Sequence, residues 1–239
     1  MGKRIIQRAR GHGGPVYRVR RKAFNYRISY PDSRIGGKAV VLKLISSAGH
    51  SAPLAKIKLG KIIFYNSASK GMYEGQEIEI GTNKETGNIL KLKDIPIGTA
   101  VYNIEVTPGD GGKFVRSSGN SAVVSKKYSG IVSILMPSKK EVNFNENCRA
   151  SIGIVAGAGR VDKPIIKAGK KYYMMKSKGK LWPRTSAVKM NVIDHPFGSG
   201  RGKNLTHGTK GKIAKKNAPA GARVGLIRPR RTGRRRGKG

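Results

Sequence analysis

Short apolar runs that alternate with polar residues begin near Lys38 and predict β-strands. Residues 39–45 are apolar except for one lysine, residues 54–65 contain the alternating stretch Lys-Ile-Lys-Leu, and residues 77–80 read Glu-Ile-Glu-Ile. Glycine and proline separate the runs about every ten residues, and this spacing is typical of a small barrel or sandwich. No helical period of 3.6 accompanies them.

A second set of runs follows from Asn88 and brings the expected number of short strands to about eleven. Turn sequences such as Pro-Gly-Asp-Gly-Gly at 108–112 and Gly-Asn at 119–120 separate its members. Because one small barrel holds five or six strands, two consecutive barrels at 38–86 and 87–165 explain the pattern better. The fold class is therefore all-β, with this second set of runs at 89–95, 100–106, 121–125, 130–136, 141–144 and 150–155.

The two ends of the chain, 1–37 and 166–239, lack a sustained period and are predicted to be extensions without regular structure. The first interleaves arginines with Tyr17, Phe24, Tyr26 and Tyr30. That combination suits stacking on unpaired bases, whereas a solvated tail seldom needs it. In the second extension, residues 186–193 are apolar enough to add one last strand.

The net charge of the two ends differs strongly from that of the middle of the chain. Lysine and arginine number 50 against 12 acidic residues, so the formal net charge is +38. Residues 1–31 carry a net +9, residues 32–162 a net +7, and residues 163–239 a net +22. Self-repulsion of this size calls for a polyanion, so nucleic acid is the expected partner.

Several other classes of protein fit the composition poorly. The single cysteine, Cys148, allows no internal disulfide and no cysteine-rich zinc site, and the histidines are too scattered to form a recognisable metal pattern. No apolar run approaches the roughly 20 residues that span a bilayer, and no secretory signal is recognisable. The glycine-rich segments lack nucleotide-loop spacing. We therefore expect no cofactor, no metal, no membrane and no small-molecule substrate.

Two stretches are candidates for nucleic-acid contact. Basic and hydroxyl side chains follow the Pro-Gly-Asp-Gly-Gly turn at once, namely Lys113, Arg116, Ser117 and Ser118. Such groups on a rigid turn suit phosphates and 2′-hydroxyls, although an ordinary solvated hairpin would look similar.

The second candidate is the Asp194-His195-Pro196 step, where the apolar sequence passes into a glycine-arginine tail. Asp194 could in principle orient His195 as a general base. Neighbouring side chains in an extended chain point to opposite faces, however, so contact of His195 with an RNA backbone is the favoured interpretation.

Five long blocks follow one another along the chain: AGHSAPLAKIKL, GTAVYNIEVTPGDGGKFVRSSGN, CRASIGIVAGAGRVDKPIIKAGK, LWPRTSAVKMNVIDHPFGSGRGK and KNAPAGARVGLIRPRRTGRRRGK. In this order they make the sequence resemble the universal large-subunit ribosomal protein two family, the L-two family. Phe197 and the APAGARVGLI block are similar to its archaeal and eukaryotic branch.

The resemblance implies an OB-like barrel followed by an SH3-like barrel, with extensions threading into ribosomal RNA. It also implies a cytoplasmic protein that binds rRNA directly, near the peptidyl transferase centre and the interface with the small subunit, among other ribosomal proteins. Besides the turn residues named above, the expected RNA-binding set is Trp182, Arg184, Asp194, His195, Gly198, Gly200, Arg201, Lys203, Arg230, Arg231, Arg234, Arg235 and Arg236.

Three functional hypotheses remain at this point. The leading one is a structural RNA-binding protein of the large ribosomal subunit without catalytic residues. The second is a direct catalytic role of His195 in peptidyl transfer, and the third is a non-ribosomal protein that packages nucleic acid.

Overall fold

The computed structural model of the chain describes residues 3–81, 83–191, 193–195, 197–198 and 220. Backbone contacts divide the chain into two units. One unit is Val19–Lys180, and the other combines Met1–Arg18 with Leu181–Gly239. The two ends of the sequence thus belong to the same unit.

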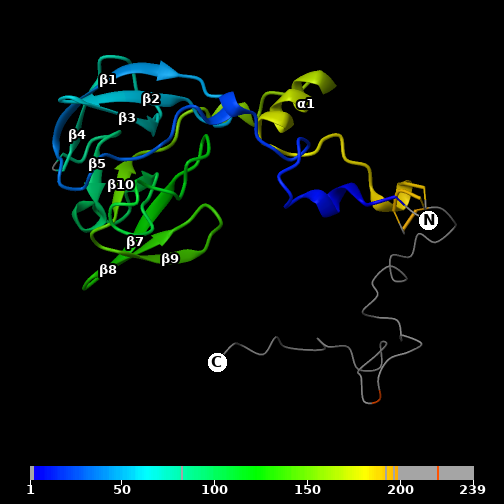
Figure 1. Cartoon of the computed structure of the whole chain (residues 1–239). Coiled ribbons are helices and arrows are strands. Elements are labelled where there is room, and N and C mark those ends of the chain that lie inside the picture. The colour runs from blue at the N-terminus through cyan, green and yellow to red at the C-terminus, as the bar shows by residue number, and fades with distance from the viewer. Residues whose placement is uncertain (1–2, 82, 192, 196, 199–219, 221–239) are drawn as a thin grey trace. The chain divides into compact units, whose positions relative to one another are not determined.

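All ten strands of the described residues lie in Val19–Lys180 and form one continuous sheet (Figure 1). Its order is β3-β2-β1-β4-β5-β10-β6-β7-β8-β9. Neighbours are antiparallel except for β4 and β5, which meet in parallel at Ile80 and Ile89. The strands are β1 Gly37–Ile45, β2 Leu54–Leu59, β3 Ile62–Ser67, β4 Glu77–Ile80, β5 Ile89–Lys91, β6 Ala100–Tyr102, β7 Ala122–Tyr128, β8 Ile131–Leu135, β9 Glu141–Asn145 and β10 Arg149–Ile152.

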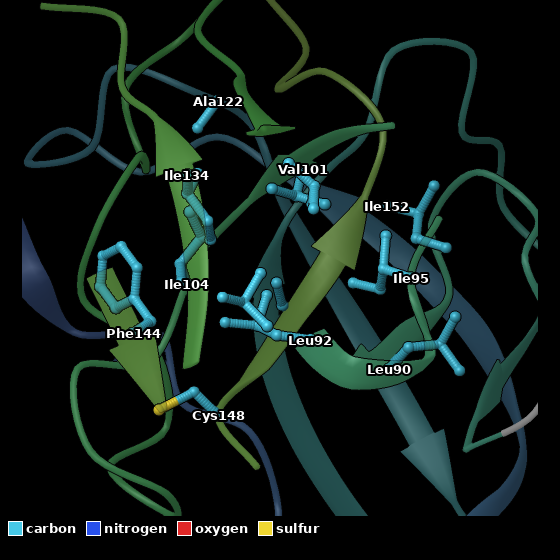
Figure 2. Packing of buried hydrophobic residues seen from close by; sticks show 13 residues of the cluster. Leu90, Leu92, Ile95, Val101, Ile104, Ala122, Ile134, Phe144, Cys148 and Ile152 are labelled. Carbon is cyan, nitrogen blue, oxygen red and sulfur yellow. The ribbon is translucent and has the colours of Figure 1, made fainter. Parts of the chain in front are cut away.

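Two large hydrophobic clusters lie along this sheet, because the alternating strands turn their apolar side chains to one face. The first joins β1 to β4, where Val41, Ile57 and Phe64 are buried. The second gathers residues from β5 to β10, with Leu92 and Ile134 completely buried, and Figure 2 shows it. The all-β prediction is confirmed, whereas the proposed boundary between residues 86 and 87 stays a prediction.

Among the described residues, one α-helix and several short 3-10 turns accompany the strands. The α-helix, α1, spans Ala168–Ser177, within a segment that was expected to lack regular structure. Its Lys, Met and Ala residues favour a helix, but its apolar residues follow no helical stripe, so the sequence pattern did not reveal it. The 3-10 turns are η1 Ile6–Ala9, η2 Arg21–Phe24, η3 Leu92–Asp94, η4 Ala158–Arg160 and η5 Ala187–Lys189.

The predicted strand at 186–193 is wrong. Residues 187–189 form η5 instead, closed by a hydrogen bond from the Lys189 amide to the Ser186 carbonyl at 3.0 Å. This hydrogen bond joins two backbone groups, and the Ser186 side chain does not cap the turn, so the apolar content of the segment did not distinguish the turn from a strand. Throughout the described ranges, no helix has both the length and the apolar character to cross a membrane.

Candidate nucleic-acid interface

The turn that the sequence singled out, residues 106–113, is held by one carboxylate. Asp110 accepts hydrogen bonds from the amides of Val106, Thr107 and Gly112 at 3.0, 3.3 and 2.9 Å. Burial raises the pKa of Asp110, but these three amides and Lys113 outweigh that effect and hold the pKa below its usual value. The turn is therefore a rigid platform for the residues that follow it.

Lys113, the first predicted contact residue, lies at the edge of this platform. Its Nζ is 3.2 Å from the Asp110 carboxylate, and its side chain is 61% exposed. At this exposure the ion pair is worth little, so the ammonium can exchange Asp110 for another anion at small cost.

Arg116 has a different position from the one that the sequence suggested. Its guanidinium is half-buried, with Nε donating to Asn103 Oδ1 at 2.8 Å and Nη2 to the Ile28 carbonyl at 3.2 Å. Burial lowers the pKa of Arg116. Arg116 therefore ties the loop to the segment around Ile28, and an RNA contact through it stays a prediction.

Ser117 and Ser118 lie beside a second loop, at 157–160. Ser117 is exposed, and Ser118 is buried, with its Oγ accepting from Arg160 Nε at 3.0 Å. Gly119 has a φ of +74°, and a Cβ there would lie 2.7 Å from Ala158 Cα. Only glycine fits that close approach, which brings Arg160 next to the predicted contact turn.

Beneath the loop runs a buried polar network that sequence reasoning missed. The Tyr30 hydroxyl donates to the Asn103 carbonyl at 2.7 Å and lies 2.7 Å from Ser151 Oγ. Asn66 donates to the same Ser151 oxygen and accepts from Asn103, each at 2.9 Å. Burial raises the pKa of Tyr30 far above its ordinary value, so the hydroxyl stays protonated.

A buried ion pair completes the network. Arg149 donates through Nε and Nη2 to Glu105 Oε1 at 3.1 and 2.8 Å, and through Nη1 to the Pro31 carbonyl at 2.9 Å. Glu105 also accepts from the Gly111 amide at 3.2 Å. The partners are up to 118 positions apart in the sequence, so no local signal could have revealed them.

Asp194 and His195 belong to the other unit, where residues near Lys3 pack beside them. The Lys3 amide donates to the Ile193 carbonyl at 2.7 Å, and Lys3 Nζ lies 3.8 Å from Asp194 Oδ1. His195 Nδ1 accepts from the Phe197 amide at 3.1 Å, and the two rings meet edge to face. Because Nδ1 already accepts this backbone hydrogen bond, it cannot donate to a carboxylate that would orient the ring. This counts against His195 as a general base.

Gly198 is required by the same tight bend. A Cβ at this position would lie 2.1 Å from the Met190 carbonyl oxygen and 2.6 Å from the Asn191 carbonyl. Any side chain would force the bend open, so Gly198 shapes the turn that presents His195.

Two hollows open in this unit beside the bend. One, of about 540 Å³, is lined by Lys3, Arg4, Lys189 and Asp194 among others. The other has a volume of about 510 Å³, and Arg184 and His195 are both among the residues that line it. Trp182 is half-buried nearby in the sequence. The structure therefore places Arg184 with His195, and it adds Lys3, Arg4 and Lys189 to the basic residues near Asp194.

The remaining predicted contact residues lie outside the described residues and stay predictions: Gly200, Arg201, Lys203, Arg230, Arg231, Arg234, Arg235 and Arg236. Over the part of the chain that the structure describes, no group of three or more His, Cys, Asp or Glu side chains could hold a metal ion.

Comparisons with known proteins agree with this architecture. The family model described as "Ribosomal Proteins L2, C-terminal domain" matches residues 85–218. Large ribosomal subunit protein uL2 of Archaeoglobus fulgidus is 45% identical, with 99% of this chain and all of the relative covered. The uL2 proteins of Methanocorpusculum labreanum and Desulfurococcus amylolyticus are 44% and 43% identical at the same coverage. The chain therefore belongs to the ribosomal protein L2 (uL2) family.

Proposed function

We propose that this chain is a structural constituent of the large ribosomal subunit and acts there by binding ribosomal RNA. The observation that carries this proposal is end-to-end similarity, since relatives named as large ribosomal subunit proteins align over 99% of the chain. The net charge of +38 supports it, because such a chain is best accommodated among phosphates.

Each of the two units contributes its own set of candidate RNA contacts. The sheet supplies rigid turns, and the 106–119 loop offers Lys113, Ser117 and the neighbouring Arg160 to phosphates and 2′-hydroxyls. The bend around His195 offers Arg184, Lys189 and Lys3. The two hydrophobic clusters support an OB-like barrel at 38–86 followed by an SH3-like barrel at 87–165.

The finer parts of the proposal rest on the family resemblance. They are direct rRNA binding early in subunit assembly, a position near the peptidyl transferase centre, contact with the small subunit, and location in the cytoplasm. The residues expected closest to the active centre are Asp194, His195, Gly198 and Gly200, which would act as RNA contacts and shape the backbone.

Sedimentation of a cell lysate tests the proposal. A lysate from cells that make this chain is centrifuged through sucrose at high salt, and the chain is quantified across the gradient by mass spectrometry. We expect one copy per large subunit, retained in salt that removes loosely bound proteins. A chain that washes off, or that sediments with DNA, would contradict the proposal.

A further inference from the structure

The helix α1 is unusual because it buries almost nothing. Of its ten residues only Ser177 is buried, and its low amphipathicity leaves no apolar stripe to pack on a core. Isolated helices shorter than about 12 residues are marginal in water. Lys167 is its N-cap, Lys170 and Lys171 lie in its first turn, and that turn has no acidic residue. The helix is therefore strongly basic at its N-terminal end.

Two exposed tyrosines project from this helix. Tyr172 is 38% and Tyr173 60% exposed, and their rings meet edge to face with centroids 5.3 Å apart. Each ring has a cation beside it: Lys176 Nζ lies 5.5 Å from the Tyr172 centroid, and the Arg20 guanidinium 5.4 Å from that of Tyr173. These cation–π contacts stabilise the two rings at the surface, where a ligand can reach them.

Other segments extend this surface. Ser177 Oγ lies 3.2 Å from the Ala48 carbonyl, and the Gly49 amide donates to the Ala23 carbonyl at 2.7 Å. These contacts link α1 and η2 through the loop around residue 49. Phe24 of η2 is 49% exposed, and its ring packs against His50 at 5.0 Å. We define the basic aromatic surface as Arg20, Phe24, Tyr172, Tyr173 and Lys176.

The charge around this surface is of one sign. Residues 163–180 hold seven lysines and residues 18–24 hold four basic residues, and neither segment has an acidic residue. A partner has to match both the charge and the exposed rings, and a protein does so poorly, because lysine is depleted at protein interfaces. RNA with unpaired nucleotides satisfies both, because phosphates neutralise the lysines while bases stack on the rings.

We propose that the basic aromatic surface binds a single-stranded stretch of RNA, with bases stacked on Tyr172 and Tyr173 and phosphates held by the flanking lysines and Arg20. The proposal rests on the proposed function, which it deepens by naming unpaired nucleotides as the target of α1. It also explains why this helix follows the sheet without packing into it.

The test compares two double variants of the full chain. In the first, Tyr172→Leu and Tyr173→Leu keep apolar bulk and helix propensity but remove the aromatic faces. In the matched control, Tyr172→Phe and Tyr173→Phe keep the faces. Binding is measured to a single-stranded adenosine oligonucleotide of about 12 nucleotides and to an RNA duplex of the same length, at about 0.5 M salt, where tail electrostatics are weakened.

We expect the leucine variant to lose about tenfold in affinity for the oligonucleotide and nothing for the duplex, because paired bases cannot stack on the rings. The phenylalanine variant should bind both as the native chain does. Unchanged oligonucleotide binding by the leucine variant would overturn the proposal, and so would an equal loss for oligonucleotide and duplex. Neither result would affect retention in the large subunit, which tests the proposed function separately.

Discussion

At the scale of single residues, the surroundings decide what an arginine does. Arg149 is buried, and its guanidinium donates hydrogen bonds to Glu105 and to the Pro31 carbonyl. Arg116 is half-buried and donates to Asn103. Both residues therefore join the N-terminal segment to the sheet. The same residue type in the tails is expected to meet phosphate, and composition alone does not separate these roles.

The buried pair gives a residue-scale prediction. Replacing Glu105→Gln leaves the Arg149 charge buried without its counter-charge, so we expect the free energy of unfolding to fall by about 3–5 kcal/mol. Urea unfolding of the full chain, followed by circular dichroism, measures this change. The matched control is Glu77→Gln at an exposed position, where we expect a change within about 0.5 kcal/mol. Equal stability of the two variants would show that the pair does not hold the network together.

At the scale of elements, turns and caps position the candidate contact groups more than strands do. The 106–113 turn depends on Asp110, and the 116–119 turn depends on the close approach at Gly119. The strands beneath provide a fixed base. We expect the candidate contact residues on such turns to lose little conformational entropy on binding RNA, because the protein already holds the turns in place.

The turn at 106–113 should respond to acid. The pKa of Asp110 is lower in the folded chain than in the unfolded chain, so the charged carboxylate stabilises the turn above the unfolded pKa of about 4. This stabilisation is lost as the pH falls through the lower folded value. We expect faster hydrogen exchange of the Gly112 amide below about pH 4, measured by NMR and normalised for intrinsic exchange. In Asp110→Asn the exchange should already be faster at neutral pH and should lose this pH dependence, and native-like protection there would contradict the assignment.

At the scale of the whole molecule, charge is divided between a near-ordinary sheet and strongly basic ends. Residues 32–162 hold 18 basic and 11 acidic side chains, whereas residues 163–239 hold 23 basic and one acidic. We therefore expect the ends to contribute most of the long-range attraction to RNA.

Deletion of 199–239 tests this division. It removes 14 basic residues, so we expect weaker binding to large-subunit rRNA and a shallower dependence of log affinity on log salt, since fewer counterions are released. Filter binding over a series of salt concentrations measures the slope. As a control, a chain whose tail arginines are all changed to lysine keeps the charge and should keep the native slope. A deletion variant with the native slope would show that the tail does not contact phosphates.

The sequence by itself determined the fold class, the polyanionic partner and the family. Alternation of apolar and polar residues with a period of two indicates a strand with one buried face. The net charge is the same whatever the fold. Long blocks in a fixed order, such as 98–120, identify the family. The sequence also located Asp110 in a turn. The helix at 168–177 escaped prediction because its apolar residues follow no helical stripe, and 186–193 was misassigned because apolar content alone does not distinguish a strand from a turn.

Only the tertiary structure decided which distant groups meet. Tyr30, Asn66, Asn103 and Ser151 form one network although 121 positions separate its ends, and Lys3 lies beside Asp194 although most of the chain stands between them in the sequence. Arg116 changed from a free contact residue to a link within the protein for the same reason. Hydrogen bonds and close packing depend on three-dimensional distance, and a periodic pattern along the chain specifies which face is buried without specifying what is buried against it.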